Sequence, residues 1–264
     1  MEDAYFAYGR IHEMYPFLKK WLPGGAGVRR RWAAFGVFDG HGGAEIAELC
    51  RERMLDEILT ESFVDDVDEA FVAGFHAMDE QALAVSEEGG ITSGCTALVV
   101  LVLGSMLFVA HVGDSLAVLS RDGSAVLLTQ PHCTANSDEG FRIKREGLMF
   151  SGSRLVHPVV ETMSIALTRA IGDISWKHPD HTGGQSTGII ATPETRQEVL
   201  YDVDEFLLIA CDGFWDVFLP QEAVDAVRLR IEQGLSRQEI VDDMVTEALR
   251  LGSSDNITLL IVDT

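Results

Sequence analysis

The chain has 264 residues, 47% of them hydrophobic and 23% charged, which is the composition of an ordinary globular protein with a sizeable core. Its 20 lysine and arginine residues stand against 42 aspartates and glutamates, which gives a net charge of −22 at pH 7. Long-range repulsion therefore argues against non-specific binding to nucleic acid or anionic membranes, and the surplus of carboxylates suits a protein that binds divalent cations.

Two further features bear on compartment and membrane association. The four cysteines form no C-x-x-C pair, and the chain opens with acidic residues instead of the basic and apolar regions of a signal peptide, so we expect an intracellular protein, cytoplasmic or nuclear. Residues 95–112 lack Asp, Glu, Lys and Arg over about the minimum length of a membrane span. They are rich in β-branched residues, however, and Gly104-Ser105 interrupts them as a hairpin loop would, so we predict two buried strands and no membrane association.

Hydrophobic periodicity places short strands and longer helices along the chain. Alternation of period two predicts strands over residues 5–8, 32–38, 96–103, 106–111, 116–120, 125–129, 194–200, 206–210 and 257–262. Helical spacing predicts helices over residues 43–59, 66–86, 138–146, 220–233 and 236–251. The segment 172–188 shows no clear period and is predicted to be a long surface loop.

The order of these elements indicates the fold class. Hairpin-linked strands in the middle of the chain favour antiparallel sheets, and helices grouped towards both ends favour an α+β protein. We predict a four-layer α-β-β-α sandwich, in which two antiparallel sheets pack face to face and helices flank them. No repeat or low-complexity linker divides the chain, so residues 1–264 are expected to form a single domain.

Three aspartates stand at the edges of apolar segments, and each is followed by a residue that favours tight turns. They are Asp39 before Gly40, Asp212 before Gly213, and Asp255 before Asn256. Taken singly, an aspartate in such a turn is more often a turn residue than a ligand. Together the three form an oxygen donor set of the kind that Mg²⁺ and Mn²⁺ prefer. Only a fold that aligns their strands could unite them, because Asp212 lies 173 residues after Asp39 (212 − 39) and Asp255 lies 43 further on (255 − 212).

Eight short stretches form a highly specific combination in this order: Met1-Glu2-Asp3, Val37-Phe38-Asp39-Gly40-His41-Gly42-Gly43, Ser93-Gly94-Cys95-Thr96-Ala97, Val112-Gly113-Asp114-Ser115, Ala166-Leu167-Thr168-Arg169-Ala170-Ile171-Gly172-Asp173, Ala191-Thr192-Pro193-Glu194, Ala210-Cys211-Asp212-Gly213-Phe214-Trp215-Asp216 and Ser254-Asp255-Asn256-Ile257-Thr258. With these stretches the chain resembles the metal-dependent protein phosphatases of the 2C type over nearly its whole length. That family holds two metal ions between two packed antiparallel sheets flanked by helices, which agrees with the layering predicted above.

The resemblance implies a site for two metal ions, Mg²⁺ or Mn²⁺. It makes Asp39 the carboxylate that bridges both ions, with Asp212 and Asp255 as further ligands of one of them. Glu2 and the carbonyl oxygen of Gly40 would hold the other ion. Such ligands at strand ends have little freedom to move, which suits a site that must hold two cations in fixed positions.

Other residues take supporting roles under the same resemblance. Asp3 is expected to hydrogen-bond metal-bound water and so orient it for catalysis. Asp114 and Asp216 match positions that hold a weaker third ion. His41, next to the bridging aspartate, is the expected general acid, and Arg169 is expected to bind substrate or to brace its own loop.

The implied reaction is the hydrolysis of phosphoserine or phosphothreonine in protein substrates. Two cations held by this ligand set would supply an activated water for in-line attack on phosphorus and would neutralise charge on the phosphoryl group. We therefore expect phosphorylated proteins as partners, no nucleic acid, and a monomeric protein.

The chain departs from the family pattern in three places. Relatives carry a phosphate-binding arginine three positions before the Met-Glu-Asp motif, on an edge strand, whereas the numbering here begins at that methionine, so we expect this strand to be missing. Leu116 stands where arginine or alanine is usual. Pro131-His132-Cys133 replaces the usual Asp-His-Lys.

Two other functions remain open on the sequence. A phosphatase-like binding module would keep the fold with weak turnover, although the intact carboxylates and His41 argue against it. Gly113-Asp114-Ser115-Leu116 also spells the nucleophile motif of a serine esterase class, but no late Asp-x-x-His follows it. The remaining histidines show no ligand spacing beyond the pair His178 and His181, which is expected to be solvated.

Overall fold

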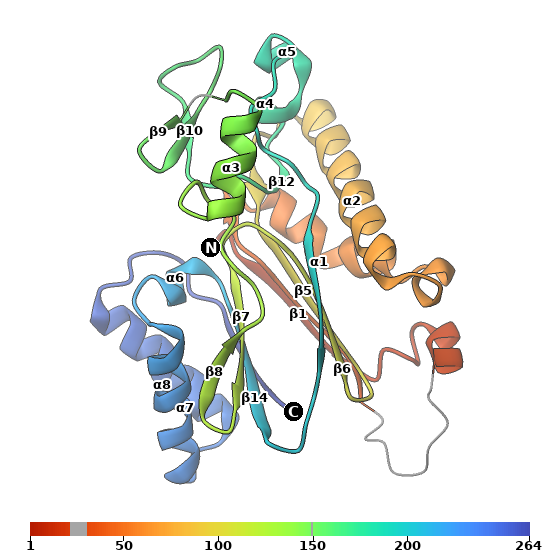
Figure 1. Ribbon diagram of the computed structural model, residues 1–264, viewed down its shortest axis with the longest axis vertical. Coiled ribbons are helices and arrows are strands. Elements are labelled where there is room, and N and C mark those ends of the chain that lie inside the picture. The colour runs from red at the N-terminus through yellow and green to blue at the C-terminus, as the bar shows by residue number, and fades with distance from the viewer. Residues whose placement is uncertain (22–30, 149) are drawn as a thin grey trace.

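The computed structural model describes residues 1–21, 31–148 and 150–264. Two antiparallel sheets pack face to face at its centre and helices cover both outer sides, so the predicted four-layer sandwich is confirmed (Figure 1). The five-stranded sheet has the order β1 (Ala4–Gly9), β2 (Trp32–Phe38), β5 (Ala97–Leu103), β6 (Met106–Val112) and β13 (Glu194–Val199). The four-stranded sheet has the order β15 (Leu259–Asp263), β14 (Asp204–Ala210), β7 (Leu116–Arg121) and β8 (Ser124–Leu127).

Side-chain alternation along the strands builds the layers, because successive residues of a strand point to opposite faces of its sheet. In β5, Val99 and Leu101 belong to the core under the first helices, whereas Leu98 and Val100 belong to the core between the two sheets. Leu207 of β14 faces the same central core from the other sheet. The central strands β5, β6, β7 and β14 are therefore buried on both faces, which is why they are nearly continuous apolar runs, whereas the edge strands β8 and β13 keep exposed residues.

Two pairs of helices close the sandwich. The helices α1 (Glu45–Ile58) and α2 (Val67–Gly89) cover the five-stranded sheet, and α7 (Pro220–Glu232) and α8 (Arg237–Leu251) cover the four-stranded sheet (Figure 1). The sequence marks where such helices begin. Ser236 and Glu239 form a capping box at the start of α8, since each side chain accepts a hydrogen bond from the backbone of the other.

Shorter elements gather at one end of the sandwich. A small sheet joins β12 (Ile171–Gly172), β4 (Gly94–Cys95) and β3 (Gly40–His41). A second small sheet, which we call the flap, joins β11 (Ser164–Ile165), β10 (Arg154–Val156) and β9 (Phe150–Ser151) beside α3 (Ser137–Arg145). The other short helices are η1 (Pro16–Trp21), η2 (Glu61–Val64), α4 (Ile174–Lys177), α5 (Pro179–Thr182) and α6 (Asp212–Trp215).

All the strands and helices predicted from periodicity are present, with ends displaced by a few residues. The prediction of a long surface loop over 172–188 is wrong in part, because α4 and α5 lie within it and Ile174 and Trp176 are buried. Each of these helices is a single turn, which is too short for a helical period to appear in the sequence. Of the histidine pair in this segment, His181 is exposed and His178 is partly exposed.

The uncharged segment 95–112 forms strands, as predicted. β5 and β6 pair along their whole length as a hairpin, with Leu103 opposite Met106 across the Gly104-Ser105 turn. None of the helices in the described part of the chain has the length and apolar character needed to cross a bilayer.

The core between the two sheets gives a direct test of the layering. Leu207 is fully buried there, so Leu207→Ala should lower the free energy of unfolding by about 2–5 kcal/mol. The matched control is Leu229→Ala on α7, where the side chain is 53% exposed and the change should stay within about 0.5 kcal/mol. Urea unfolding followed by circular dichroism measures both. Equal losses for the two variants would contradict the assignment of Leu207 to the central core.

Candidate active site

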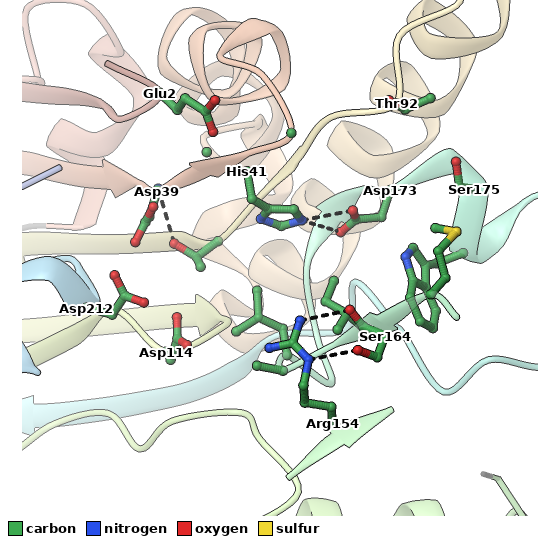
Figure 2. Close-up of a pocket in the computed structure, with 18 of the residues that line it drawn as sticks. Glu2, Asp39, His41, Thr92, Asp114, Arg154, Ser164, Asp173, Ser175 and Asp212 are labelled. Atoms are coloured by element: carbon green, nitrogen blue, oxygen red, sulfur yellow. Dashed lines mark hydrogen bonds and ion pairs between the residues drawn. The ribbon is translucent and has the colours of Figure 1, made fainter. Parts of the chain in front are cut away.

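A cavity of about 530 Å³ opens at the end of the sandwich where β2, β6 and β14 end and β1 and β15 begin. Neighbouring strands are antiparallel, so strand ends and strand starts that lie far apart in the sequence meet at this edge. The predicted site residues that line the cavity are Glu2, Asp39, Gly40, His41, Asp114, Asp212 and Asp255. Figure 2 labels Glu2, Asp39, His41, Asp114 and Asp212 among them.

The two acidic residues at the start of the chain are fastened to the segment that leads into β15. The backbone N–H of Glu2 donates a hydrogen bond of 2.6 Å to the Asn256 side-chain oxygen. The Thr258 hydroxyl donates one of 2.8 Å to Asp3. Glu2 is therefore held at the same side of the cavity as Asp255, although 253 positions separate them (255 − 2).

Asp39 follows β2 and is held on both sides of its backbone by Thr96. The Thr96 N–H donates to the Asp39 carbonyl oxygen at 2.9 Å, and the Asp39 N–H donates to the Thr96 hydroxyl at 3.2 Å. The next residue must be glycine, because a Cβ on Gly40 would overlap the backbone carbonyl oxygen of Glu2. This close approach places the Glu2 segment against the Asp39 turn.

Asp212 and Asp255 lie on two turns that are tied together. Asp212 begins α6 directly after β14, and Asp255 precedes β15. The Ser253 hydroxyl donates to the Gly213 carbonyl oxygen at 2.6 Å, and the Cys211 N–H donates to the Thr258 carbonyl oxygen at 3.2 Å. These bonds fix the turn that carries Asp255 against the turn that carries Asp212.

The crowding of carboxylates shifts their protonation equilibria. Burial raises the pKa of Asp39 far above its usual range, and the charges of Asp212, Asp3 and Asp114 raise it further. Burial also raises the pKa of Asp114, to about 7, with a contribution from the charge of Asp212. The pKa of Asp212 is raised as well, first by burial. Negative charge at this edge of the sheets is therefore costly unless positive charge accompanies it.

The donor set fits hard divalent cations. Its lining groups are carboxylate and carbonyl oxygens, which are the ligands that Mg²⁺ and Mn²⁺ prefer. Asp3 supplies an independent sign. Its Oδ1 atom is buried and has no hydrogen-bond partner among the described residues. A buried carboxylate oxygen without a partner is rare, and here it fits a water molecule held next to the ligands.

His41 is paired with an aspartate to which the sequence analysis assigned no role. The His41 Nε2 atom lies 2.8 and 3.0 Å from the two carboxylate oxygens of Asp173, which is buried (Figure 2). Burial lowers the pKa of His41, but the hydrogen bond and charge of Asp173 outweigh it and leave the pKa raised. The small sheet β12-β4-β3 aligns the two residues, and Gly94 between them has to be glycine because a Cβ there would overlap the Asp173 carboxylate.

The backbone at Asp173 is strained and is held by its neighbours. Its φ of 58° and ψ of 50° lie in the left-handed region, which costs a non-glycine residue roughly 1–2 kcal/mol. Asp79 of α2 accepts hydrogen bonds from the Gly172 N–H at 2.8 Å and from Lys177 at 2.6 Å. Lys177 also donates to the Ala170 carbonyl oxygen at 2.7 Å. Together these hydrogen bonds stabilise the strained backbone conformation in which the Asp173 side chain points at His41.

Arg169 does not line the cavity. Its guanidinium donates to Glu139 at 2.6 and 3.2 Å and to the Thr192 carbonyl oxygen at 2.9 Å. Burial opposes ionisation of Glu139, but its hydrogen bonds from Arg169, Arg142 and Thr168 lower the pKa to about 2. Of the two roles expected for Arg169, this geometry favours bracing of its segment over contact with substrate.

Asp216 lies one helical turn beyond Asp212, and its N–H donates to the Asp212 carbonyl oxygen at 2.8 Å. Its side chain is exposed and does not line the cavity, but its negative charge raises the pKa of both Asp114 and Asp212. Asp216 is thus near enough to these two aspartates to influence their protonation.

The structure also brings together a group that sequence spacing missed, formed by His111, His132 and Glu194. One candidate ligand atom of each lies within 4.8 Å of the others. The two imidazole rings are stacked, however, with centroids 4.3 Å apart and planes at 16°. Imidazole lone pairs lie in the ring plane, and a single ion cannot lie in two stacked planes. His132 instead accepts a hydrogen bond from the Gly113 N–H at 3.2 Å and so supports the turn before Asp114.

The wall opposite the carboxylates comes from the flap and the segment after it. It contains the apolar side chains of Met163, Ile165, Leu167 and Trp176, together with Arg154. Sequence reasoning missed these residues because the strands of the flap are only two or three residues long. The single-turn helix that carries Trp176 gives no period either.

Comparison with known proteins decides the family. The family profile "Protein phosphatase 2C" matches residues 6–257. The chain belongs to the protein phosphatase 2C family. The resemblance drawn from the motifs is thereby confirmed, and the family is metal-dependent, which agrees with the oxygen donor set of the cavity.

Curated relatives from plants share about a third of the sequence with this member of the protein phosphatase 2C family. The chain is 33% identical over 264 residues to "Probable protein phosphatase 2C 42" of Oryza sativa subsp. japonica, an alignment that covers 86% of this chain and 74% of the relative. It is 34% identical over 267 residues to "Probable protein phosphatase 2C 22" of Arabidopsis thaliana, which covers 99% of this chain and 64% of the relative. The chain spans 56% of another relative, "Probable protein phosphatase 2C 43" of Arabidopsis thaliana.

Solved structures agree on the fold. A serine-threonine phosphatase 2C from Toxoplasma gondii superposes with a TM-score of 0.73 at 21% identity, over 99% of this chain and 90% of that one. A sex-determining protein of C. elegans superposes with a TM-score of 0.75 at 24% identity, over 99% of this chain and 61% of that one.

The serine esterase alternative is not supported by the geometry of this protein phosphatase 2C. Ser115, the nucleophile that such an enzyme would need, is buried, and its hydroxyl pairs with the Thr96 hydroxyl at 2.9 Å. Ser115 does not line the cavity either. A buried hydroxyl without access to the cavity cannot attack a substrate ester.

Repulsion among the carboxylates predicts a pH-dependent effect of Asp39→Asn in the metal-free protein. An aspartate whose pKa is raised by folding stabilises the fold below its unfolded pKa of about 4, and this contribution is lost as pH rises. Asparagine has no charge to lose. With EDTA present, the Tm of Asp39→Asn should therefore exceed that of wild type, and the difference should grow from pH 5 to pH 8. Each kcal/mol gained in the free energy of unfolding corresponds to a rise in Tm of about 2–4 °C.

Thermal unfolding followed by circular dichroism measures this difference. The exposed Asp202 provides the control, since Asp202→Asn should leave the Tm difference from wild type independent of pH. A Tm difference for Asp39→Asn that stays constant over the same range would contradict the electrostatic argument.

Proposed function

We propose that this chain is a metal-dependent protein serine/threonine phosphatase that hydrolyses phosphoserine and phosphothreonine in protein substrates. The observation that carries the proposal is the convergence on one cavity of Asp39, Asp114, Asp212 and Asp255, with the His41–Asp173 pair at its side. Membership of the protein phosphatase 2C family supports the same reaction. In this proposal residues 1–264 act as one catalytic domain and as a monomer.

The oxygen ligands divide between two cations, Mg²⁺ or Mn²⁺. Asp39 would contribute to holding both ions, Asp212 and Asp255 would hold one of them, and Glu2 with the Gly40 carbonyl oxygen would hold the other. When bound, the ions supply an activated water nucleophile and neutralise charge on the phosphoryl group. The fixed turns described above support this assignment, because hydrogen bonds within the protein hold the four segments that carry the ligands.

Residues outside this ligand set have separate tasks. The free Oδ1 atom of Asp3 accepts a hydrogen bond from water and so orients it. Asp114 and Asp216 together offer a weaker third cation site, which their mutual electrostatic interaction supports. A protein phosphatase needs no further covalent nucleophile, because water attacks phosphorus directly.

His41 protonates the leaving oxygen of serine or threonine. The Nε2 atom of His41 is hydrogen-bonded to Asp173. The other ring nitrogen faces away from Asp173 and is available to the leaving group (Figure 2). Asp173 fixes the ring and favours its protonated form, as a carboxylate does for a general acid. A serine alkoxide is a poor leaving group, so this proton is needed more for protein substrates than for aryl phosphates.

Metal dependence tests the proposed reaction. A phosphoserine peptide should be hydrolysed with Mn²⁺ or Mg²⁺ and not with excess EDTA. Asp39→Ala should lower kcat/KM by about 100-fold or more, since changes outside the ligand set alone typically cost 10- to 100-fold. Asp202→Ala, far less buried, serves as the control. Activity that persists in EDTA, or that is unchanged in Asp39→Ala, would overturn the mechanism.

The same assay separates the second candidate, a binding module that keeps the fold without turnover. Such a module would bind a phosphopeptide in a metal-dependent manner and release no phosphate. The complete set of ligands with a paired His41 favours turnover, because a decayed site is expected to lose these groups first.

The acid role of His41 predicts a dependence on the leaving group. His41→Gln should slow phosphopeptide hydrolysis by about 10²- to 10⁴-fold, and p-nitrophenyl phosphate hydrolysis much less, because nitrophenolate leaves without a proton. Asp173→Asn should shift the same ratio in the same direction by a smaller factor. Steady-state kinetics on both substrates measure the ratio, and an equal loss on both would argue against the acid role.

A further inference from the structure

Among the described residues that line the cavity, one side chain besides His41 can carry a positive charge. Six carboxylates line it, those of Glu2 and of five aspartates, and among the described residues Arg154 is the one arginine or lysine in its lining. Asp173 is already paired with His41. Arg154 therefore stands alone in a strongly acidic cavity, on the wall opposite the carboxylates that hold cations in the proposed function.

Two hydrogen bonds hold the guanidinium in place. Its Nε atom donates to the Ser164 hydroxyl at 2.9 Å, and its Nη2 atom donates to the Ser164 carbonyl oxygen at 2.8 Å. Ser164 lies on β11, which pairs with β10. The next residue, Leu155, is fully buried in the small core under the flap. Arg154 is itself exposed, but Ser164 of the neighbouring strand positions its guanidinium, which reduces the freedom that it loses when it binds a ligand.

The rest of the guanidinium has no partner in the described part of the chain. Among residues 1–21, 31–148 and 150–264, no carboxylate forms an ion pair with Arg154 within 4.0 Å, and its two hydrogen bonds to Ser164 leave the Nη1 atom without a partner. Figure 2 shows the unpaired end of Arg154 directed towards the side of the cavity that holds Asp114 and Asp212. Its free N–H groups therefore point at the space above the carboxylates.

Arginines with a structural role in this molecule form ion pairs with buried carboxylates, and Arg154 differs from them. Arg169 is paired with Glu139 at 2.6 Å, and Arg121 with Asp204 at 2.6 Å. Both guanidinium groups donate to carboxylates that are buried. Arg154 hydrogen-bonds neutral oxygens of its own flap and pairs with no carboxylate of the described residues, which leaves its positive charge uncompensated there.

We propose that Arg154 binds the phosphoryl group of the substrate from the flap side, opposite the metal ligands. A guanidinium presents parallel N–H donors that match two phosphoryl oxygens, and such charge-assisted bonds are among the strong ones. The inference rests on the proposed function for the identity of the ligand. It adds a phosphate-binding residue that none of the recognised motifs contains.

The test measures orthophosphate affinity as well as turnover. Isothermal titration calorimetry of the Mn²⁺-loaded protein with inorganic phosphate should show binding that Arg154→Gln weakens by about 10- to 100-fold, the factor expected when a hydrogen bond to a charged group is lost. Arg154→Lys keeps the positive charge but loses the paired N–H donors of the guanidinium, so its phosphate affinity should lie between those of wild type and Arg154→Gln. Ser164→Ala removes one anchor and should weaken binding in the same direction by less.

Steady-state kinetics give the second readout. In Arg154→Gln the KM for p-nitrophenyl phosphate should rise by about the same factor as the phosphate dissociation constant, with a smaller change in kcat. Arg145→Gln is the matched control, because Arg145 is an exposed arginine of α3 that does not line the cavity, and this variant should behave as wild type. Circular dichroism and the Tm show that each variant is folded.

The possible outcomes test the phosphate-binding role of Arg154 separately from the proposed phosphatase activity. Unchanged phosphate affinity in folded Arg154→Gln overturns the inference and leaves the proposed phosphatase activity standing. Selective loss on acidic phosphopeptides, with orthophosphate and p-nitrophenyl phosphate unaffected, also overturns it, because Arg154 would then bind a neighbouring acid. Weakened phosphate binding in a protein that hydrolyses no substrate supports the inference and defeats the proposed function.

Discussion

The constraint on which the rest of the structure depends is the crowding of carboxylates at one edge of two packed sheets. Burial and mutual repulsion raise the pKa of Asp39, Asp114 and Asp212, so the fold must hold groups together that would separate if they were free. Three apolar cores supply the rigidity, one between the sheets and one under each pair of helices. A cation at this edge converts the repulsion into attraction, which couples metal binding to stability.

Antiparallel topology explains how a set so dispersed in the sequence becomes one site. The ends of β2, β6 and β14 and the starts of β1 and β15 reach the same edge of the sandwich. Hydrogen bonds then fix the register of the turns: Glu2 to Asn256 joins the first strand to the last, and Thr96 holds Asp39 to the neighbouring strand. Each ligand therefore stands on a turn whose backbone is already bonded before any ion arrives.

The sequence predicted the layers and the carboxylates for different reasons. Strands such as β5 are long enough for period two to appear, and Asp39, Asp212 and Asp255 stand in recognisable motifs. The pairing of His41 with Asp173 could not be predicted, because it depends on β3, β4 and β12, each two residues long, and on the absence of a side chain at Gly94. Arg169 had the right motif, but its buried partner Glu139 lies 30 positions away on α3.

The two walls of the cavity belong to different parts of the fold. The carboxylates stand on turns between strands of the large sheets, whereas Arg154 and the apolar side chains of Met163 and Ile165 belong to the flap, which has a small core of its own around Leu155 and Trp176. Changes in the flap can therefore alter the shape and charge of one wall without moving the metal ligands. Under the proposed function, this separation keeps the hydrolytic residues on the rigid sheets and leaves the flap as an independent element that can contribute to substrate choice.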